Sequence, residues 1–190
     1  MKDILQDIVA HTHALGFLNI VKVNGDDAQT GIDSMAEDRS VILQANTKTA
    51  QVEMKGTFGM PNLNKLDIHL KCPEYKDGAS IEVVQADRNG ATIPVGIHFE
   101  NKAGDFKNDY RFMNADIINE KLKTVKFKGA QWAVEVQPTL GNVQRFKLQA
   151  TANSEETVFT VITDGDNLKF KFGDASTHAG EFVFQHNIEG

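Results

Sequence analysis

The chain carries six histidines and 26 acidic residues, the side chains from which zinc and calcium sites are built. His11 and His13 are two positions apart, so on a helix they point in different directions, and no cysteine or histidine cluster supports them. Residues 164–166 read Asp-Gly-Asp, like the start of a calcium loop, but the glycine position and terminal glutamate of that loop are absent. We therefore expect surface histidines and a hairpin turn, with no metal site.

The single cysteine is the remaining candidate for covalent chemistry. Lys71 lies beside Cys72 and could lower the pKa of the thiol, but Cys72 abuts Pro73 at a predicted helix end and no base is evident. The sequence also lacks a phosphate-binding loop, a serine nucleophile elbow and a dinucleotide fingerprint. The sequence thus predicts a protein that is not an enzyme and needs no cofactor.

Basic residues on predicted helices are the other candidates for function. Lys65, Lys71 and Arg145 fall on outer helix faces, with Lys147 flanking Arg145. Such residues can contact phosphates without reading base sequence, but they also serve solubility alone. The functional interpretation requires that all the helices face one surface.

Composition limits the possibilities further. The chain has 190 residues and a net charge of −6, which argues against tight wrapping of nucleic acid unless basic residues are confined to one surface. Its apolar runs fall short of the roughly 20 residues of a membrane span, and the N-terminus does not read as a signal peptide. A single cysteine fits a reducing compartment, so we expect a cytoplasmic protein (the host cytoplasm if viral) without membrane association.

Three amphipathic helix signals recur about every sixty residues, each followed by alternating strands, which predicts an α+β fold of repeated units that share a sheet. The helices are predicted at 2–15, 61–71 (with Pro61 at the first helical position) and 138–150. The second helix should bury Leu63, Leu66 and Leu70, and the third should bury Val143, Phe146 and Ala150, with Asn142 and Arg145 opposite. The predicted strands are 18–23, 28–32, 40–45, 51–55, 80–85, 92–100, 107–114, 131–137, 157–163, 167–172 and 180–188.

The order of segments resembles a known family. Residues 109–118 (DYRFMNADII) read as an edge strand that enters a connector, and 134–138 (VEVQP) read as a strand that meets the third helix. Earlier, 29–35 (QTGIDSM) with 40–43 (SVIL) and 58–63 (FGMPNL) fit a strand–loop–strand and the entry to a second helix. This order resembles a DNA sliding clamp, the polymerase processivity factor, of the trimeric type found in tailed bacteriophages and in proliferating cell nuclear antigen.

The resemblance implies a first clamp domain at 1–115, an interdomain connector at 116–129 and the first half of a second domain at 130–190. It implies clamp-like repeats with the helices on one face of a curved sheet, in a homotrimeric ring that encircles duplex DNA and tethers a DNA polymerase. An ATP-driven clamp loader would place the ring on DNA. The family carries four helices per two-domain subunit, so we expect that the last quarter is lacking. The first helix departs from the family because Asp3 and Asp7 make its outer face acidic.

The resemblance also implies two contact regions. Polymerase tails would dock in an apolar pocket beneath the connector, for which the candidates are Val41, Leu43, Ile117, Ile118 and Leu122. These residues could instead close the core between domains. The ring would close by pairing of strand 107–114 with strand 180–188 of the next subunit. If the fourth unit is lacking, the apolar side of the third helix and its strands would be exposed, and burial of that surface would also favour a non-native oligomer.

A second interpretation stays open. The chain could be a non-enzymatic α+β structural or binding module, such as a virion component, in which the repeated architecture is coincidental. A clamp would place all three predicted helices on one side of a continuous sheet, whereas another scaffold would scatter them.

Overall fold

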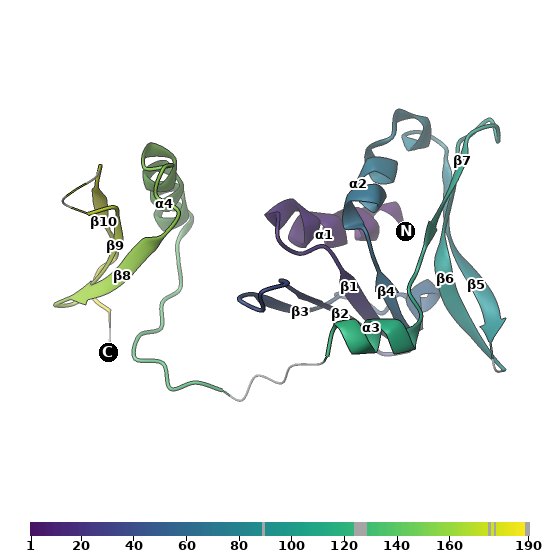
Figure 1. Cartoon of the computed structure of the whole chain (residues 1–190), viewed down its shortest axis with the longest axis horizontal. Helices are drawn as coiled ribbons and strands as arrows, with labels where there is room; N and C mark the ends of the chain where they lie inside the picture. Colours follow the sequence, from purple (N-terminus) through teal and green to yellow (C-terminus); the bar gives the residue numbers. More distant parts are fainter. Residues whose placement is uncertain (89, 124–128, 175, 177, 189–190) are drawn as a thin grey trace. The chain divides into compact units, whose positions relative to one another are not determined.

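The computed structural model describes residues 1–88, 90–123, 129–174, 176 and 178–188 (Figure 1). The chain forms two compact units, Met1–Lys126 and Phe127–Gly190. Both combine α-helices with antiparallel sheets, which confirms the α+β class. The division between the units falls inside the connector predicted at 116–129.

The first unit begins with a four-stranded antiparallel sheet in the order β3-β2-β1-β4. Its strands are β1 (Val21–Gly25), β2 (Thr30–Met35), β3 (Ile42–Asn46) and β4 (Gly56–Met60). The turn between β1 and β2 is held by Asp26, whose Oδ1 accepts hydrogen bonds from the backbone N–H groups of Ala28 and Gln29, each at 2.8 Å. Because these bonds favour the charged form, they lower the pKa of Asp26. Strand β1 lies inside the sheet, because it pairs with β2 on one side and with β4 on the other.

Two helices, α1 (Lys2–His11) and α2 (Leu63–Lys71), cover one face of this sheet (Figure 1). Helix α2 buries Leu63, Leu66 and Leu70, as the apolar spacing predicts. Gly16, with φ of 86°, ends the turn that follows α1, a conformation that glycine adopts without strain. Together the helices and the sheet enclose the main core, to which α1 contributes Leu5, Ile8 and Val9.

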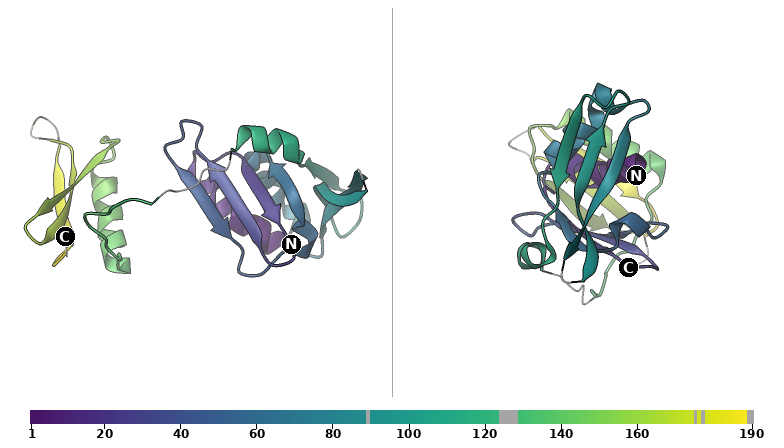
Figure 2. Two further views of the ribbon diagram at one scale, coloured as in Figure 1. Left: turned by 90° about the horizontal axis from the view of Figure 1, so that it is seen from below. Right: turned by 90° about the vertical axis from the view of Figure 1, so that its right-hand side faces the viewer.

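A second sheet of the first unit has the order β5-β6-β7, with β5 (Ser80–Arg88), β6 (Ala91–Glu100) and β7 (Lys107–Arg111) (Figure 2, right). Just beyond β7, Met113 exchanges two backbone hydrogen bonds with Gly59 of β4, at 2.8 and 3.0 Å, and so links the two sheets. The buried Tyr110 of β7 donates its hydroxyl to the carbonyl of Pro61, and burial raises the pKa of this phenol.

Helix α3 (Ala115–Lys121) lies on the opposite face of the four-stranded sheet from α1 and α2 (Figures 1 and 2). Asn114 caps it, since its side chain accepts a hydrogen bond from the N–H of Ile117 at 3.0 Å. The helix packs so closely on β4 that a Cβ atom at Gly59 would lie 2.8 Å from side-chain carbons of Ile118. The first part of the predicted connector is therefore a helix, and the sheet lies between two helical layers.

The second unit holds helix α4 (Leu140–Ala152) and a sheet of order β10-β9-β8, with β8 (Phe159–Asp164), β9 (Asn167–Phe172) and β10 (Gly180–Gln185). Thr139 begins the helix by accepting a hydrogen bond from the N–H of Asn142 at 3.2 Å. The core of this unit contains Phe146, Phe170, Phe172, Phe182 and Phe184, and the exposed Phe159 packs its ring against three of them.

Several local predictions are wrong. Residues 51–55 are not a strand: Val52–Met54 form a 3₁₀ turn, and the strand begins at Gly56. Pro61 precedes the helix, which begins at Leu63 after Asn62 takes a left-handed conformation with φ of 50°. Residues 131–137 are irregular, because within the described part of the chain they have no strand to pair with.

Candidate functional site

The outer face of α1 and α2 carries two of the predicted DNA-binding residues. Lys65 and Lys71 are both exposed on α2. The Nζ atom of Lys71, however, lies 2.5 Å from Oδ2 of Asp67, one helical turn away. On α1, Asp3 and Asp7 are exposed, as the sequence predicted. This face therefore has mixed charge, and phosphate contacts there would be few and weak.

Arg145 and Lys147, the other two predicted DNA-binding residues, lie on helix α4. Contrary to the prediction from its spacing, Arg145 does not lie opposite the packed face of this helix. Its guanidinium donates a hydrogen bond to the carbonyl of Val183 at 3.1 Å and lies 5.3 Å from the ring centroid of Phe182. Asn142 likewise donates to the carbonyl of Phe184 at 2.6 Å. Both side chains reach the edge strand β10, so the expectation that they lie opposite the packed face is wrong. Lys147 is exposed on α4.

The two pairs, Lys65 with Lys71 and Arg145 with Lys147, belong to separate compact units. Whether they share one DNA-facing surface therefore stays a prediction.

The connector helix and the first sheet enclose a small cavity of about 20 Å³. Met35 and Ile42, which are cross-strand partners on β2 and β3, supply its apolar wall together with Leu122, which caps α3. Asp33 and Lys123 add charged groups at its rim. A cavity of this size holds about one water molecule, so a docked side chain would have to be small or displace part of the wall.

Of the five predicted pocket residues, only Leu122 lines this cavity. Ile118 is fully buried against β4, Ile117 is exposed on α3, and Val41 is exposed just before β3. Leu43 faces the other side of the sheet, where it lines a groove of about 650 Å³ with Ile4 and Ile8 of α1. Side chains alternate between the faces of a strand, so the neighbour of Leu43, Ile42, occupies the predicted position.

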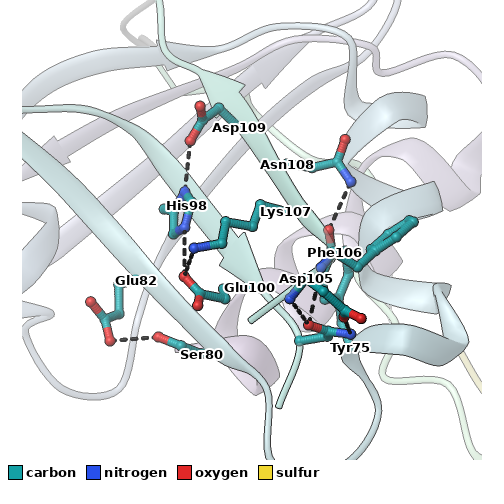
Figure 3. Close-up of polar contacts among 11 residues, drawn as sticks. Tyr75, Ser80, Glu82, His98, Glu100, Asp105, Phe106, Lys107, Asn108 and Asp109 are labelled. Atoms are coloured by element: carbon teal, nitrogen blue, oxygen red, sulfur yellow. Dashed lines mark hydrogen bonds and ion pairs between the residues drawn. The ribbon is translucent and has the colours of Figure 1, made fainter. Parts of the chain in front are cut away.

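Strand β7 is an open edge of its sheet, and its charged side chains form ion pairs with those of the neighbouring strand β6 (Figure 3). His98 Nδ1 lies 2.9 Å from Asp109 Oδ1, and His98 Nε2 lies 3.4 Å from Glu100 Oε2. Lys107 Nζ is 3.1 Å from the same oxygen of Glu100. The hydrogen bond to Asp109, with a smaller contribution from Glu100, raises the pKa of His98.

Strand β10 is one of the two edge strands of the sheet in the second unit. Glu181 on this strand lies 3.1 Å from Lys171 Nζ and 3.5 Å from Lys169 Nζ, both on β9. Lys171 is the main cause of a lowered pKa of Glu181. Both of these edges thus present charged side chains beside backbone that no strand pairs with among the described residues.

The sequence interpretation missed three positions that the structure makes prominent. Ile42 and Met35 could have been found by testing both faces of the predicted strands for the pocket. His69 lies within the apolar face of α2, 5.1 Å from the ring of Phe99, and desolvation followed by the charge of Lys65 lowers its pKa. Its spacing from Leu66, three positions, was the available signal.

A comparison with known structures identifies the architecture. The fold matches the crystal structure of PCNA from Thermococcus kodakaraensis with a TM-score of 0.61, over 95% of this chain and 68% of that chain, at 12% sequence identity. The fold is that of a sliding clamp. No protein-family model and no curated protein sequence matches the chain, so this likeness rests on structure alone. The clamp fold confirms the element order from which the resemblance was drawn.

Among the described residues, no group of three or more histidine, cysteine, aspartate or glutamate side chains is placed to hold a metal ion. In the same residues, no helix is both long enough and apolar enough to cross a bilayer.

Proposed function

We propose that this chain is a subunit of a DNA polymerase sliding clamp of the trimeric, phage-like type. The observation that carries the proposal is the clamp fold itself, in which α1 and α2 cover one face of a sheet while the connector helix α3 covers the other. A clamp acts by topology: a closed ring stays on the duplex without base contacts and keeps a tethered polymerase at high effective concentration near the primer end. No step of bond chemistry is required of the chain, so the proposal is for a non-enzymatic protein that needs no cofactor.

DNA would lie against the helices. Lys65, Lys71, Arg145 and Lys147 are the proposed phosphate contacts, with Lys71 and Arg145 weakened by their bonds to Asp67 and to the carbonyl of Val183. Contacts of this kind are independent of base sequence and sensitive to salt, with a log–log slope that falls by roughly one unit per contact removed. Weak contacts suit a ring that must slide.

Partners would dock at the connector. The wall formed by Met35, Ile42 and Leu122 offers apolar contact to the C-terminal tail of a polymerase, and the exposed Ile117 and Val41 extend the apolar area. A clamp loader would open and close the ring in the cytoplasm (the host cytoplasm if viral). We also expect self-association, both in a homotrimer and through the exposed apolar residues of β8.

The rival function is a structural or binding module without DNA, such as a virion component. Peptide binding at the cavity between α3 and the first sheet distinguishes the two functions, because a clamp would bind client peptides there. We expect a peptide from the C-terminus of a cognate polymerase to bind the purified chain, and Leu122→Asp to weaken binding at least tenfold, because a charge would replace part of the apolar wall.

Ile68→Asp controls for the added charge alone, because Ile68 is an exposed residue of α2, which is on the opposite face of the sheet. Leu122 is buried, so circular dichroism must first show that Leu122→Asp is folded. Binding by wild type that survives Leu122→Asp unchanged would contradict the assignment of the site. Failure of cognate polymerase tails to bind wild type would favour the rival.

A further inference from the structure

β7 and β10 are two of the edge strands of this chain, and among the described residues no strand pairs with the outer edge of either. An unpaired edge offers N–H and C=O groups to any strand that approaches in register. The clamp resemblance implies only that these two edges meet between subunits. Which residues then lie opposite one another depends on the hydrogen-bonding phase and the charges of this particular chain.

The phase of β7 follows from one hydrogen bond. Phe112 donates its N–H to the carbonyl of Val95 on β6 at 3.0 Å, so the backbone groups of Phe112 point toward β6. Because these directions alternate along a strand, Tyr110 also points toward β6, while Lys107, Asp109 and Arg111 point to the open edge. Met113, just beyond β7, fits this alternation, because both of its backbone groups bond to Gly59 of β4 and not to β6.

The phase of β10 follows from the hairpin beside it. Asp164 and Asn167 close a two-residue turn between β8 and β9, and the pair that closes such a turn is hydrogen-bonded. Alternation then turns the backbone of Phe170 toward β10, where it pairs with Phe182. Glu181 and Val183 are left pointing to the open edge. The carbonyl of Val183 is in fact bonded by Arg145 rather than by a strand.

The residues whose backbone points to the open edge are odd-numbered on both strands. Any antiparallel register that places one of these residues on β7 opposite one on β10 therefore satisfies the hydrogen-bonding phase. Charge separates them. With Asp109 opposite Glu181 two carboxylates would face each other, which destabilises a cross-strand pair. With Arg111 opposite Val183, or Lys107 opposite Glu181, only one outward pair forms between β7 and the part of β10 before its bulge at Val183.

The remaining register places Arg111 opposite Glu181 and Asp109 opposite Val183. It pairs opposite charges and uses both outward residues of β10. It also sets the buried Tyr110 beside the buried Phe182, on the core side of each sheet, so that the apolar layer continues across the junction. The His98–Asp109 contact at 2.9 Å compensates the aspartate, whose cross-strand partner is apolar.

We propose that copies of this chain join head to tail in this one register, with β7 of one copy pairing antiparallel with β10 of the next and Arg111 facing Glu181 as the selecting pair. The proposal rests on the proposed function for the choice of partner, a second copy. It adds the residue pairing and the reason that slipped registers are rejected. The two patches are different, so the contact can close a ring.

The test uses full-length chains with Cys72 replaced by serine and a single new cysteine each. A chain with Val183→Cys is mixed under mild oxidation with a chain that carries Asp109→Cys, the partner in the proposed register, or with one that carries Lys107→Cys or Arg111→Cys, the partners in the registers slipped by two residues in either direction. A Cα separation near 5.5 Å, as in a hydrogen-bonded antiparallel pair, suits a disulfide. We expect the mixed disulfide with Asp109→Cys to exceed the other two at least fivefold, an estimate that follows from the steepness of this geometric limit.

The control is Glu82→Cys, which is on β5 and away from the β7 edge of the same sheet. A dominant product with Lys107→Cys or Arg111→Cys would overturn the register, and yields no greater than those of Glu82→Cys would overturn the pairing of the edges. Neither result depends on peptide binding at the connector, so failure here is distinguishable from failure of the proposed function.

Charge reversal gives an independent readout. Arg111→Glu should weaken association about tenfold, because it replaces an opposite-charge pair by two carboxylates. Glu181→Arg in the same chain should restore it, whereas Glu82→Arg should not. Failure of Glu181→Arg to rescue a correctly folded Arg111→Glu chain would contradict the selecting pair.

Discussion

The first strands of the two units, β1 and β8, occupy equivalent places in a helix-plus-meander motif but have opposite surroundings. In sequence β8 is the more apolar: it reads FTVITD, whereas β1 reads VKVNG. Yet Val21 and Val23 on β1 are fully buried, while Phe159 and Val161 on β8 are 42% and 47% exposed. The difference is that β4 pairs with the second edge of β1, and that α1 and α2 together cover the face of the sheet on which Val21 and Val23 lie. Neighbouring strands and layers, rather than the strand's own apolarity, set its burial.

Making the same substitution in β1 and β8 tests this difference in burial most directly. Val23→Ala should lower the free energy of unfolding by about 2–3 kcal/mol, because it removes fully buried methyl groups and leaves a cavity. Val161→Ala should change it by less than about 0.5 kcal/mol, as at other exposed positions. Urea titration followed by circular dichroism measures both. Equal losses would mean that β8 is covered as well as β1 in solution.

The second prediction tests helix α3, which covers the other face of the first sheet. Gly59→Val should destabilise the first unit by about 2 kcal/mol, because even a Cβ would overlap Ile118 and force α3 away from β4. Combining Gly59→Val with Ile118→Ala should recover part of the loss, because the smaller side chain makes room for the new one. Additive losses in this double mutant would show that α3 does not rest on Gly59.

The smallest effect concerns pH and the buried histidine of the first unit. The folded pKa of His69 lies below its unfolded value, so the unfolded chain binds the proton first as the pH falls. The first unit should therefore lose stability as the pH drops below about 6.5. His98 acts in the opposite direction, because its raised pKa contributes stability that is present at low pH and lost as the pH rises.

His69→Phe removes the first effect and keeps the second, so the difference between wild type and this variant isolates His69. Urea midpoints at pH 7.5 and pH 5.5 measure it, with His11→Phe, an exposed position on α1, as the control. Parallel pH profiles of wild type and His69→Phe would contradict the assignment.

The sequence predicted what local pattern determines. The buried stripe of Leu63, Leu66 and Leu70, and most strands, followed from periodicity. What failed depended on partners distant in the sequence. Residues 131–137 alternate like a strand, but a strand requires a neighbour.

The candidate site shows the same division between local pattern and long-range packing. The connector was predicted from segment order and stays a prediction, whereas Leu122, one of its predicted pocket residues, lines the cavity between α3 and the first sheet. Whether Ile42 or Leu43 faces the connector depends on the strand's exact phase, and a one-residue choice exchanges the two faces. Arg145 reaches β10 because α4 packs close to that edge, which helical periodicity alone does not reveal.

The measurement that tests the central claim most directly asks whether the chain encircles DNA. A chain that carries both Asp109→Cys and Val183→Cys, with Cys72 replaced by serine, is assembled on nicked circular DNA and oxidised. It is then washed in high salt, which removes proteins held by phosphate contacts alone. We expect the protein to stay on the circle, and to be released when the circle is cut once or the disulfides are reduced. Equal retention on circular and linear DNA, or loss from both despite complete cross-linking, would contradict the claim that this fold acts as a ring.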